Sequence, residues 1–288
     1  MPALLPRAVF EELRGGRALP GAFGFLWACG DLEGLRLPTV AIVGTRAATP
    51  YGRGLAHRFA AELGAAGCAI LSGLALGIDA AAHEGALAAG APTIGVLGGG
   101  HGHFFPRRNR QLAERMLASG GAVLSPFPPE RNAFPSQFLE RNGVVAALAD
   151  ALVVIEAPER SGALNTAGWA AGYIPVLAVP GDVDRAHVRG CHALIRDGAT
   201  LARSSDDVLA EIGMRATEKL AAKRSGVGRR TDPLEREILR ALAQGERTID
   251  ELAGATGESA GRLLAALGML QLESLVERRD GARYAVAR

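Results

Sequence analysis

The sequence predicts a doubly wound α/β fold followed by a small C-terminal winged-helix domain. From Thr39 to about Asp206, short apolar segments alternate with Ala- and Leu-rich segments of helical periodicity. This alternation is typical of a parallel sheet that is covered by helices on both faces. Beyond residue 230, helical segments and a hairpin pattern replace it. The chain has 288 residues, of which 48% are hydrophobic and 22% charged, enough for one large and one small domain.

Six short apolar segments are expected to form the strands of a Rossmann-like parallel sheet, because each is short enough to be a buried strand. They are Val40–Val43, Ala69–Leu71, Thr93–Leu97, Ala122–Leu124, Leu152–Ile155 and Val176–Val179. The intervening segments carry apolar residues at roughly helical spacing, which predicts helices. These are Gly52–Leu63, Asp79–Ala88, Asn109–Ala118, Gln137–Leu148 and Leu164–Ala171, and a last helix ends near Arg215.

The chain is expected to consist of four parts. Residues 1–37 form a short N-terminal extension, residues 38–215 the Rossmann-like domain, residues 216–230 a basic flexible linker and residues 231–288 the winged-helix domain. In the last part, three helices are expected over Pro233–Leu242, Thr248–Thr256 and Ser259–Leu272, before a hairpin over Val276–Val286. Thr248 and Glu251 have the spacing of a capping box.

Composition excludes several classes of protein. The formal net charge of +2 is too small to indicate nucleic-acid binding, so a DNA site would need a local cluster of arginines. Cys29, Cys68 and Cys191 lie far apart, which argues against a disulfide framework or a zinc cage and favours the reducing cytoplasm. No export signal or membrane-spanning run is recognisable. Because phosphate-loop and metal-ligand spacings are also missing, no cofactor is expected.

Small residues follow most of the predicted strands. The segments are Gly44-Thr45-Arg46, Ser72-Gly73, Gly98-Gly99-Gly100, Ser161-Gly162-Ala163 and Pro180-Gly181. In an open α/β sheet the carboxyl ends of the strands are neighbours, and ligands bind in the crevice that they form. A tight turn would explain each glycine alone, but not so many on one edge. The sequence therefore predicts a ligand site at this edge, with Arg46 directed at phosphate.

These motifs resemble, in order, those of the DNA-processing protein A (DprA/Smf) family. The matching strings are Val40-Ala-Ile-Val-Gly-Thr-Arg46, Ser72-Gly-Leu-Ala-Leu-Gly-Ile-Asp-Ala-Ala-Ala-His83, Phe105-Pro-Arg-Arg-Asn109, Arg141-Asn142, Glu156 with Ser161-Gly-Ala-Leu-Asn-Thr-Ala167, and Pro180-Gly181 followed by Leu194-Ile195. The resemblance covers roughly Pro20 to Asp207, and the C-terminal elements resemble that family's winged-helix module. It implies a cytoplasmic homodimer that binds single-stranded DNA, loads RecA recombinase in natural transformation and catalyses no reaction.

Site residues follow from the resemblance by motif position. It implies phosphate contacts for Arg46 and Arg107. The whole implied DNA-binding set is Gly44, Thr45, Arg46, Ser72, Gly73, Gly99, Arg107, Asn109, Arg141, Asn142, Ser161 and Gly162. The implied dimer contacts are Leu194, Ile195 and Leu201. The chain departs from the family pattern at Pro126, Gly143 and His192, where the family usually has Glu, Arg and Asn, so one cationic group of the family's site is missing or relocated.

Two catalytic readings compete with DNA binding. Asp79 and His83, with Glu84 nearby, could form a metal site or an acid/base pair, although Asp79 also suits a helix N-cap and His83 a hydrogen-bonded core position. The chain could instead be a nucleotide phosphoribohydrolase. Enzymes of that type carry a PGGxGTxxE motif, and Trp169 stands where its catalytic acid would be.

A third alternative is a transcription regulator that reads duplex DNA with the helix from Ser259. That helix offers only Arg262 as a cation, which suits packing better than reading of the major groove. The hairpin is more basic, with Arg278, Arg279 and Arg283. We therefore expect weak duplex contact or protein–protein contact through the C-terminal domain.

Overall fold

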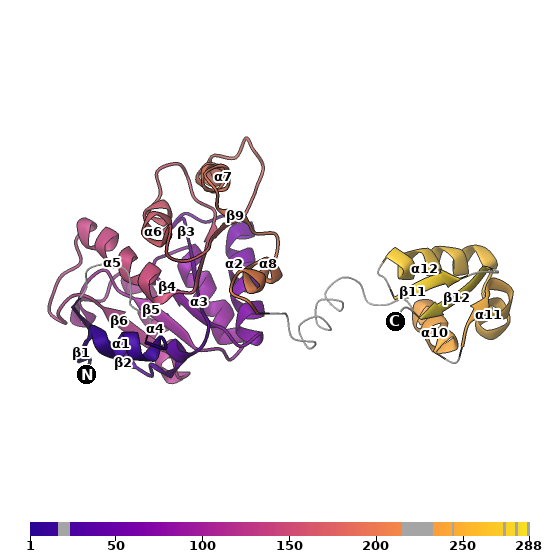
Figure 1. Ribbon diagram of the computed structural model, residues 1–288, viewed down its shortest axis with the longest axis horizontal. Coiled ribbons are helices and arrows are strands. Elements are labelled where there is room, and N and C mark those ends of the chain that lie inside the picture. The colour runs from indigo at the N-terminus through magenta and orange to yellow at the C-terminus, as the bar shows by residue number, and fades with distance from the viewer. Residues whose placement is uncertain (17–23, 215–232, 244, 273–274, 280–281, 287–288) are drawn as a thin grey trace. The chain divides into compact units, whose positions relative to one another are not determined.

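The computed structural model describes residues 1–16, 24–214, 233–243, 245–272, 275–279 and 282–286. The chain divides into two compact units, one over Met1–Leu220 and the other over Ala221–Arg288. Both are drawn in Figure 1. The linker expected over residues 216–230 lies outside the described residues.

The first unit is built on one nine-stranded sheet of order β1-β2-β6-β5-β4-β3-β7-β8-β9. The six predicted strands form its parallel centre. They are β3 (Thr39–Gly44), β4 (Ala69–Ser72), β5 (Thr93–Val96), β6 (Ala122–Ser125), β7 (Ala151–Ile155) and β8 (Val176–Ala178). The predicted doubly wound α/β fold is confirmed. Strands buried on both faces need side chains that are apolar on both faces, which explains their continuous runs of Val, Ile, Leu and Ala.

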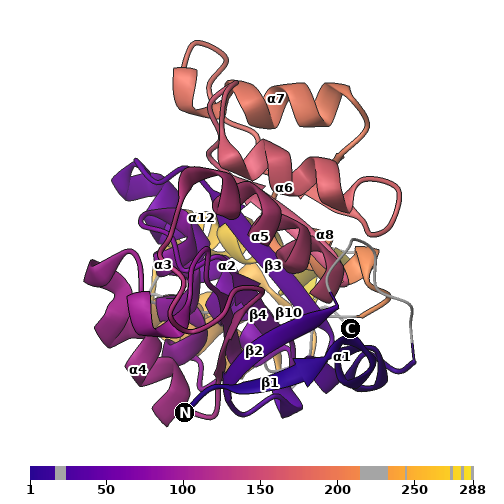
Figure 2. The ribbon, with the colours of Figure 1, turned by 90° about the vertical axis from the view of Figure 1, so that its left-hand side faces the viewer.

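Helices cover both faces of this sheet (Figures 1 and 2). One face packs against α2 (Pro50–Ala65), α3 (Ile78–Ala88) and α8 (Ser205–Glu211), through side chains such as Phe59 and Leu209. The other face packs against α1 (Arg7–Leu13), α5 (Pro135–Leu148), α6 (Gly162–Ala170) and α7 (Arg189–Arg196). A further helix, α4 (Arg110–Ala118), packs through Met116 in a smaller apolar cluster. Short 3-10 turns occupy Glu33–Arg36, His101–His103, Arg107–Asn109 and Ala186–Val188.

Three strands and two helices of this unit, α1 and α7, were not expected from the sequence. β1 (Ala3–Pro6) pairs antiparallel with β2 (Phe25–Gly30), and β2 pairs antiparallel with β6. Residues 1–37, expected as a short extension, thus contribute two strands and α1 to the sheet domain. At the opposite edge, β9 (Thr200–Leu201) pairs with β8. Among the described residues, no helix is long and apolar enough to span a membrane.

The second unit has the predicted winged-helix elements around its own core. Its helices are α10 (Pro233–Leu242), α11 (Ile249–Thr256) and α12 (Ala260–Leu272), and its three-stranded sheet has the order β10 (Arg247–Thr248), β12 (Arg283–Val286), β11 (Val276–Arg279). Ile238, Leu252 and Leu267 are buried at its centre. The capping box forms as predicted, because Thr248 Oγ1 accepts from Glu251 N at 3.3 Å while Glu251 Oε2 accepts from Thr248 N at 2.7 Å. The expected turn residues Asp280 and Gly281 lie outside the described part.

The sheet has its topological switch point between β3 and β7. The helix after β3, α2, lies on one face of the sheet, whereas the helix after β7, α6, lies on the other. Because the two connections diverge there, a crevice opens at the carboxyl ends of these strands.

Candidate functional site

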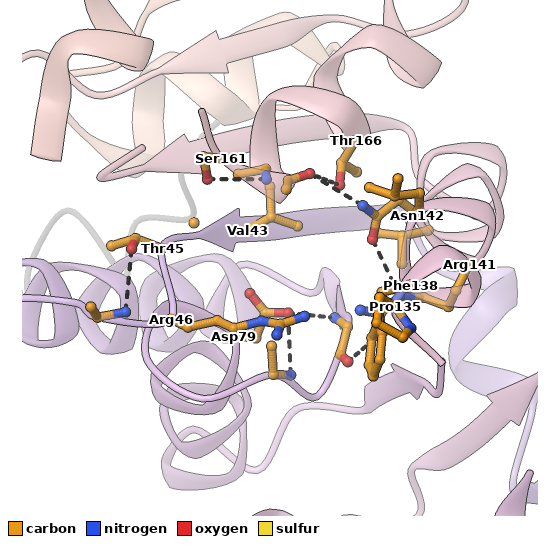
Figure 3. Close-up of a pocket in the computed structure, with 18 of the residues that line it drawn as sticks. Val43, Thr45, Arg46, Asp79, Pro135, Phe138, Arg141, Asn142, Ser161 and Thr166 are labelled. Atoms are coloured by element: carbon orange, nitrogen blue, oxygen red, sulfur yellow. Dashed lines mark hydrogen bonds between the residues drawn. The ribbon is translucent and has the colours of Figure 1, made fainter. Parts of the chain in front are cut away.

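A cavity of about 640 Å³ lies at the carboxyl edge of the parallel sheet (Figure 3). Segments after β3, β4 and β7 form part of its wall, and α5 closes another side. It brings together many of the residues predicted to bind DNA: Gly44, Thr45, Arg46, Gly73, Arg141, Asn142, Ser161 and Gly162. The edge predicted from the positions of small residues is therefore a real concavity.

Arg46 lies in the segment between β3 and α2. Thr45 N donates to Glu156 O at 2.7 Å, and Thr49 caps α2 by accepting from Gly52 N at 3.0 Å. The Arg46 side chain is exposed, and its guanidinium carbon lies 5.0 Å from the centroid of the Phe138 ring. This cation–π contact leaves the charge accessible at the mouth of the cavity.

The segment after β4 forms the floor and is tied down through its backbone. Asp79 Oδ2 accepts from Gly73 N at 3.0 Å and from Ala75 N at 3.4 Å. Asn109 Nδ2 donates to the carbonyls of Leu74 and Ala75, both at 2.9 Å. Leu74 has a φ of 55°, an uncommon conformation for a side chain of this size, so these bonds hold the segment in a shape that it would rarely adopt alone.

Arg141 supports the same floor from α5. Its side chain is buried, Nη1 donates to the carbonyls of Gly73 and Val96, and Nε donates to Asn142 Oδ1 at 3.3 Å. Burial lowers the pKa of Arg141 to about 10, against the opposing effect of Asp79. Burial likewise raises the pKa of Asp79, although Arg141 and the backbone donors oppose this. A guanidinium with these hydrogen bonds holds the segment after β4 in place rather than offering its donors to a ligand.

Four predicted residues do not line the cavity. Ser72 is buried and donates from Oγ to Ile42 O at 2.6 Å, while Asn109 is buried against the floor segment. Gly99 packs so closely that an added Cβ would lie 2.9 Å from Ala133 Cβ. Arg107 is exposed in the turn after Pro106. Ser72, Asn109 and Arg141 donate to carbonyl groups of the protein itself, and their contacts with DNA stay a prediction.

Aromatic side chains lie at the cavity, and none of them was predicted to belong to the site. Phe105 and Phe138 both line it, with ring centroids 5.9 Å apart in an edge-on arrangement. Phe134, one helical turn before Phe138, is exposed, and Arg131 lies over its ring at 5.7 Å. The i, i+4 spacing of Phe134 and Phe138 near arginines is the sequence pattern from which this aromatic group could have been predicted. Aromatic faces next to cations suit stacking of unpaired bases together with contact to phosphates.

The N-terminus of α6 forms the opposite wall. Ser161 caps this helix by accepting from Ala163 N at 3.2 Å. Asn142 Nδ2 donates to Gly162 O and to Asn165 Oδ1, both at 3.2 Å, which couples α5 to α6. Arg160, just before the cap, also lines the cavity and is exposed. The helix dipole and this cation both favour an anion on this side.

The catalytic interpretations of Asp79 and His83 can be compared with the surroundings of these side chains among the residues that the structure describes. They contain no cluster of three His, Cys, Asp or Glu side chains that could hold a metal. Asp79 is engaged by backbone amides, and His83 Nδ1 lies 2.7 Å from Thr93 Oγ1 in the core. Burial lowers the pKa of His83 to about 3, which keeps it neutral. Asp79 lies in the first turn of α3, whose N-cap is Gly77, so the predicted N-cap role of Asp79 is wrong. The geometry favours structural roles for both residues over a metal site or an acid/base pair.

We predict that His83 makes the protein acid-labile. Its folded pKa of about 3 lies below its ordinary value of 6.5, so the unfolded chain takes up the proton first and stability falls as the pH drops below 6.5. Between pH 7 and pH 5 the free energy of unfolding should therefore fall by about 2 kcal/mol. Urea unfolding of wild type and His83→Gln at both pH values measures it. An identical pH dependence in the two proteins would contradict a buried neutral imidazole.

The residues proposed for self-association lie at the β9 edge. Leu194 and Ile195, on α7, are half-buried against the core, and Leu201, on β9, is 41% exposed. His192 Nε2 lies 3.0 Å from Gly181 O, so this departure from the family pattern keeps a polar contact with the segment after β8.

A second departure from the family pattern is Gly143. An added Cβ there would lie 3.3 Å from the Trp169 ring, which leaves little room for an arginine.

In the second unit, arginines that could meet duplex DNA have acidic neighbours. Arg262 on α12 pairs with Glu258 at 2.7 Å, and Arg279 on β11 pairs with Glu277 at 2.5 Å. Arg283 lies 3.9 Å from Glu251. These ion pairs reduce the positive potential that a phosphate backbone would meet.

Comparisons with known proteins identify both units. Residues 16–213 match the family described as DNA recombination-mediator protein A, and residues 221–282 match the DprA winged helix domain. A Mycobacterium tuberculosis protein that carries the name DprA is 40% identical over 276 residues, which are 93% of this chain and 70% of that protein.

Two solved structures are similar to this chain over about two thirds or more of its length. DNA processing protein A from Streptococcus pneumoniae shares 38% identity with a TM-score of 0.62, covering 66% of this chain and 67% of that one. DNA processing protein A from Helicobacter pylori, whose structure addresses its single-stranded DNA binding mode, shares 28% identity with a TM-score of 0.63. That match covers 73% of this chain and 94% of the Helicobacter chain.

Proposed function

The chain belongs to the DNA recombination-mediator protein A family, and from this premise we propose that it binds single-stranded DNA in the cavity at the carboxyl edge of its sheet. The observation that carries the proposal is the position of Arg46 over Phe138, next to Phe105, at the cavity mouth. A phosphate can meet the guanidinium while a neighbouring base stacks on an aromatic ring. The single-stranded DNA binding of the Helicobacter relative supports the same reading.

Preference for single strands follows from the aromatic side chains. A ring can stack only on a base whose face is free, and bases in a duplex already stack on their neighbours. Every base has such a face, so we expect tolerance of base sequence. The formal net charge of +2 means that attraction of the backbone depends on arginines near the cavity, among them Arg46 and Arg160.

The finer proposals concern what the bound strand is used for. We propose that the protein is a cytoplasmic homodimer that loads RecA recombinase onto incoming DNA in natural transformation, and that it is not an enzyme and needs no cofactor. A dimer related by a two-fold axis would present two cavities to one strand. The second unit contributes at most weak contact to duplex DNA.

A binding assay tests the central proposal. We expect the protein to bind a single strand more tightly than a duplex of equal length at two salt concentrations, with or without chelator. Phe138→Ala should weaken single-strand binding by about 1–3 kcal/mol, the range for one stacked base. Tyr173→Ala is the matched control, because Tyr173 is exposed beyond the opposite end of α6. Equal affinity for duplex, or no effect of Phe138→Ala, would contradict stacking in the cavity.

The dimer has its own test. Leu201→Glu places a charge on the exposed edge strand and should convert a dimer to a monomer in light scattering at micromolar protein. Leu194→Glu should do the same, although Leu194 also packs against the core, so its folding must be checked. A monomeric wild-type protein would refute the dimer. Release of base from AMP, or RecA filament assembly unaffected by the protein, would refute the non-enzymatic and RecA-loading proposals respectively.

A further inference from the structure

Glu156, the residue after β7, joins both ends of the segment that carries Arg46. Its carbonyl accepts from Thr45 N at 2.7 Å. Its carboxylate accepts from Thr49 N at 2.8 Å through Oε2, and from Thr49 Oγ1 through Oε1. Only 3% of the residue is exposed. The five residues from Thr45 to Thr49 are thus closed into a loop by one neighbour.

The surrounding backbone is arranged to make room for this carboxylate. Glu156 has a φ of 50°, in the left-handed region that non-glycine residues rarely occupy. At Gly52 an added Cβ would lie 2.3 Å from the carboxyl carbon of Glu156. A glycine at 156 would adopt this backbone more easily but would leave Thr49 without its acceptor. The geometry therefore requires the side chain as well as the turn.

A carboxylate near a phosphate site would ordinarily repel the ligand. Here it does not line the DNA cavity but a second cavity of about 620 Å³, on the other side of the Thr45–Thr49 loop. Oε1 also lies 3.6 Å from His187 Nε2 in that second cavity. The hydrogen bonds of its carboxylate run to Thr49, so Glu156 contacts the segment that carries Arg46 without lining the first cavity.

We propose that Glu156 is a positioning residue for single-strand binding, and this rests on the function proposed above. It holds the Thr45–Thr49 loop so that Arg46 stands over Phe138 at the cavity mouth. Removing a negative charge near a DNA site should by itself tighten binding. A positioning role predicts the opposite sign for Glu156→Ala, namely weaker binding.

A double-mutant cycle tests this in the full-length chain. Glu156→Ala should lower single-strand affinity and flatten its salt dependence by about as much as Arg46→Ala, roughly 0.7 in slope for one phosphate contact. The double variant should bind no more weakly than Arg46→Ala, because both changes remove the same contact. Glu156→Gln, which keeps an acceptor for Thr49 N and a donor for Thr49 Oγ1, should restore most of the affinity. Asp182→Ala, which removes another acid of the second cavity, is the charge control and should not weaken binding.

The results of these binding assays distinguish failure of the positioning role of Glu156 from failure of the cavity as the DNA site. Additive losses in the double variant, or tighter binding by Glu156→Ala, would overturn the positioning role while leaving the cavity as the DNA site. If Arg46→Ala itself has no effect on binding, the proposed site fails. Should Glu156→Ala not fold, Thr49→Val removes the hydroxyl that donates to Glu156, together with the acceptor that caps α2. Unchanged affinity and salt slope in that variant would refute the inference.

Discussion

Replacing Arg141 with alanine is expected to destabilise the first unit by about 3–5 kcal/mol, the cost of leaving a buried charge without its partner. Arg141 is 3% exposed and donates to the carbonyls of Gly73 and Val96, so its loss leaves two acceptors unpaired. Asp79, 5% exposed, would also lose the cation that offsets its burial. We expect single-strand affinity to fall as well, because the floor segment would lose its support.

Urea unfolding measures the first of these effects. Arg110→Ala is the matched control, since its exposed pair with Glu114 should contribute about 0–1 kcal/mol. Arg141→Lys keeps a charge but loses the Nε donor to Asn142, so it should recover only part of the stability. A loss below about 1 kcal/mol in Arg141→Ala would mean that the floor does not depend on this side chain. Arg141 would then be free to contact DNA.

Replacing Arg46 and Arg107 together with alanine is expected to remove two phosphate contacts. Removal of each one should flatten the plot of log affinity against log salt by roughly 0.7, and binding should weaken about equally for all base sequences. The two together would make affinity about sevenfold less sensitive to a change from 50 to 200 mM salt. Arg46 lines the cavity, whereas Arg107 is exposed outside it, two residues after Phe105. The Arg107 contact therefore requires a strand that continues past Phe105.

The single variants decide how far the strand extends. Arg203→Ala is a suitable control, because Arg203 is exposed, pairs with Asp207 on α8 and carries the same charge. If Arg46 and Arg107 are merely solvated, their replacement should shift stability by at most about 0.5 kcal/mol and leave DNA binding unchanged. A folded double variant with wild-type affinity and salt slope would show that the strand binds elsewhere. An effect of Arg46→Ala without one of Arg107→Ala would confine the site to the cavity.

Local sequence patterns were sufficient to predict the elements whose residues all share one environment, such as strands that are buried on both faces. The six central strands are buried on both faces, so their apolar runs predict them directly, and their bounds shift by at most one residue in the structure. The capping box at Thr248 depends on residues three apart and was equally readable. β2 was missed because its partner β6 lies far along the chain, and edge pairing of this kind leaves little local signal.

The edge at which the site lies was also decided by the sequence itself. In a parallel sheet the carboxyl ends of the strands must meet, so Gly44, Gly73 and Gly162 had to lie close together. Only the tertiary structure decided which way the polar side chains face. Arg46 and Arg141 are similar in sequence terms, but α5 packs Arg141 beneath the segment after β4, whereas Arg46 stands in a loop open to solvent. Phe105 and Phe138 come together only when that helix docks, because burial and ring contact are set by packing between elements distant in sequence.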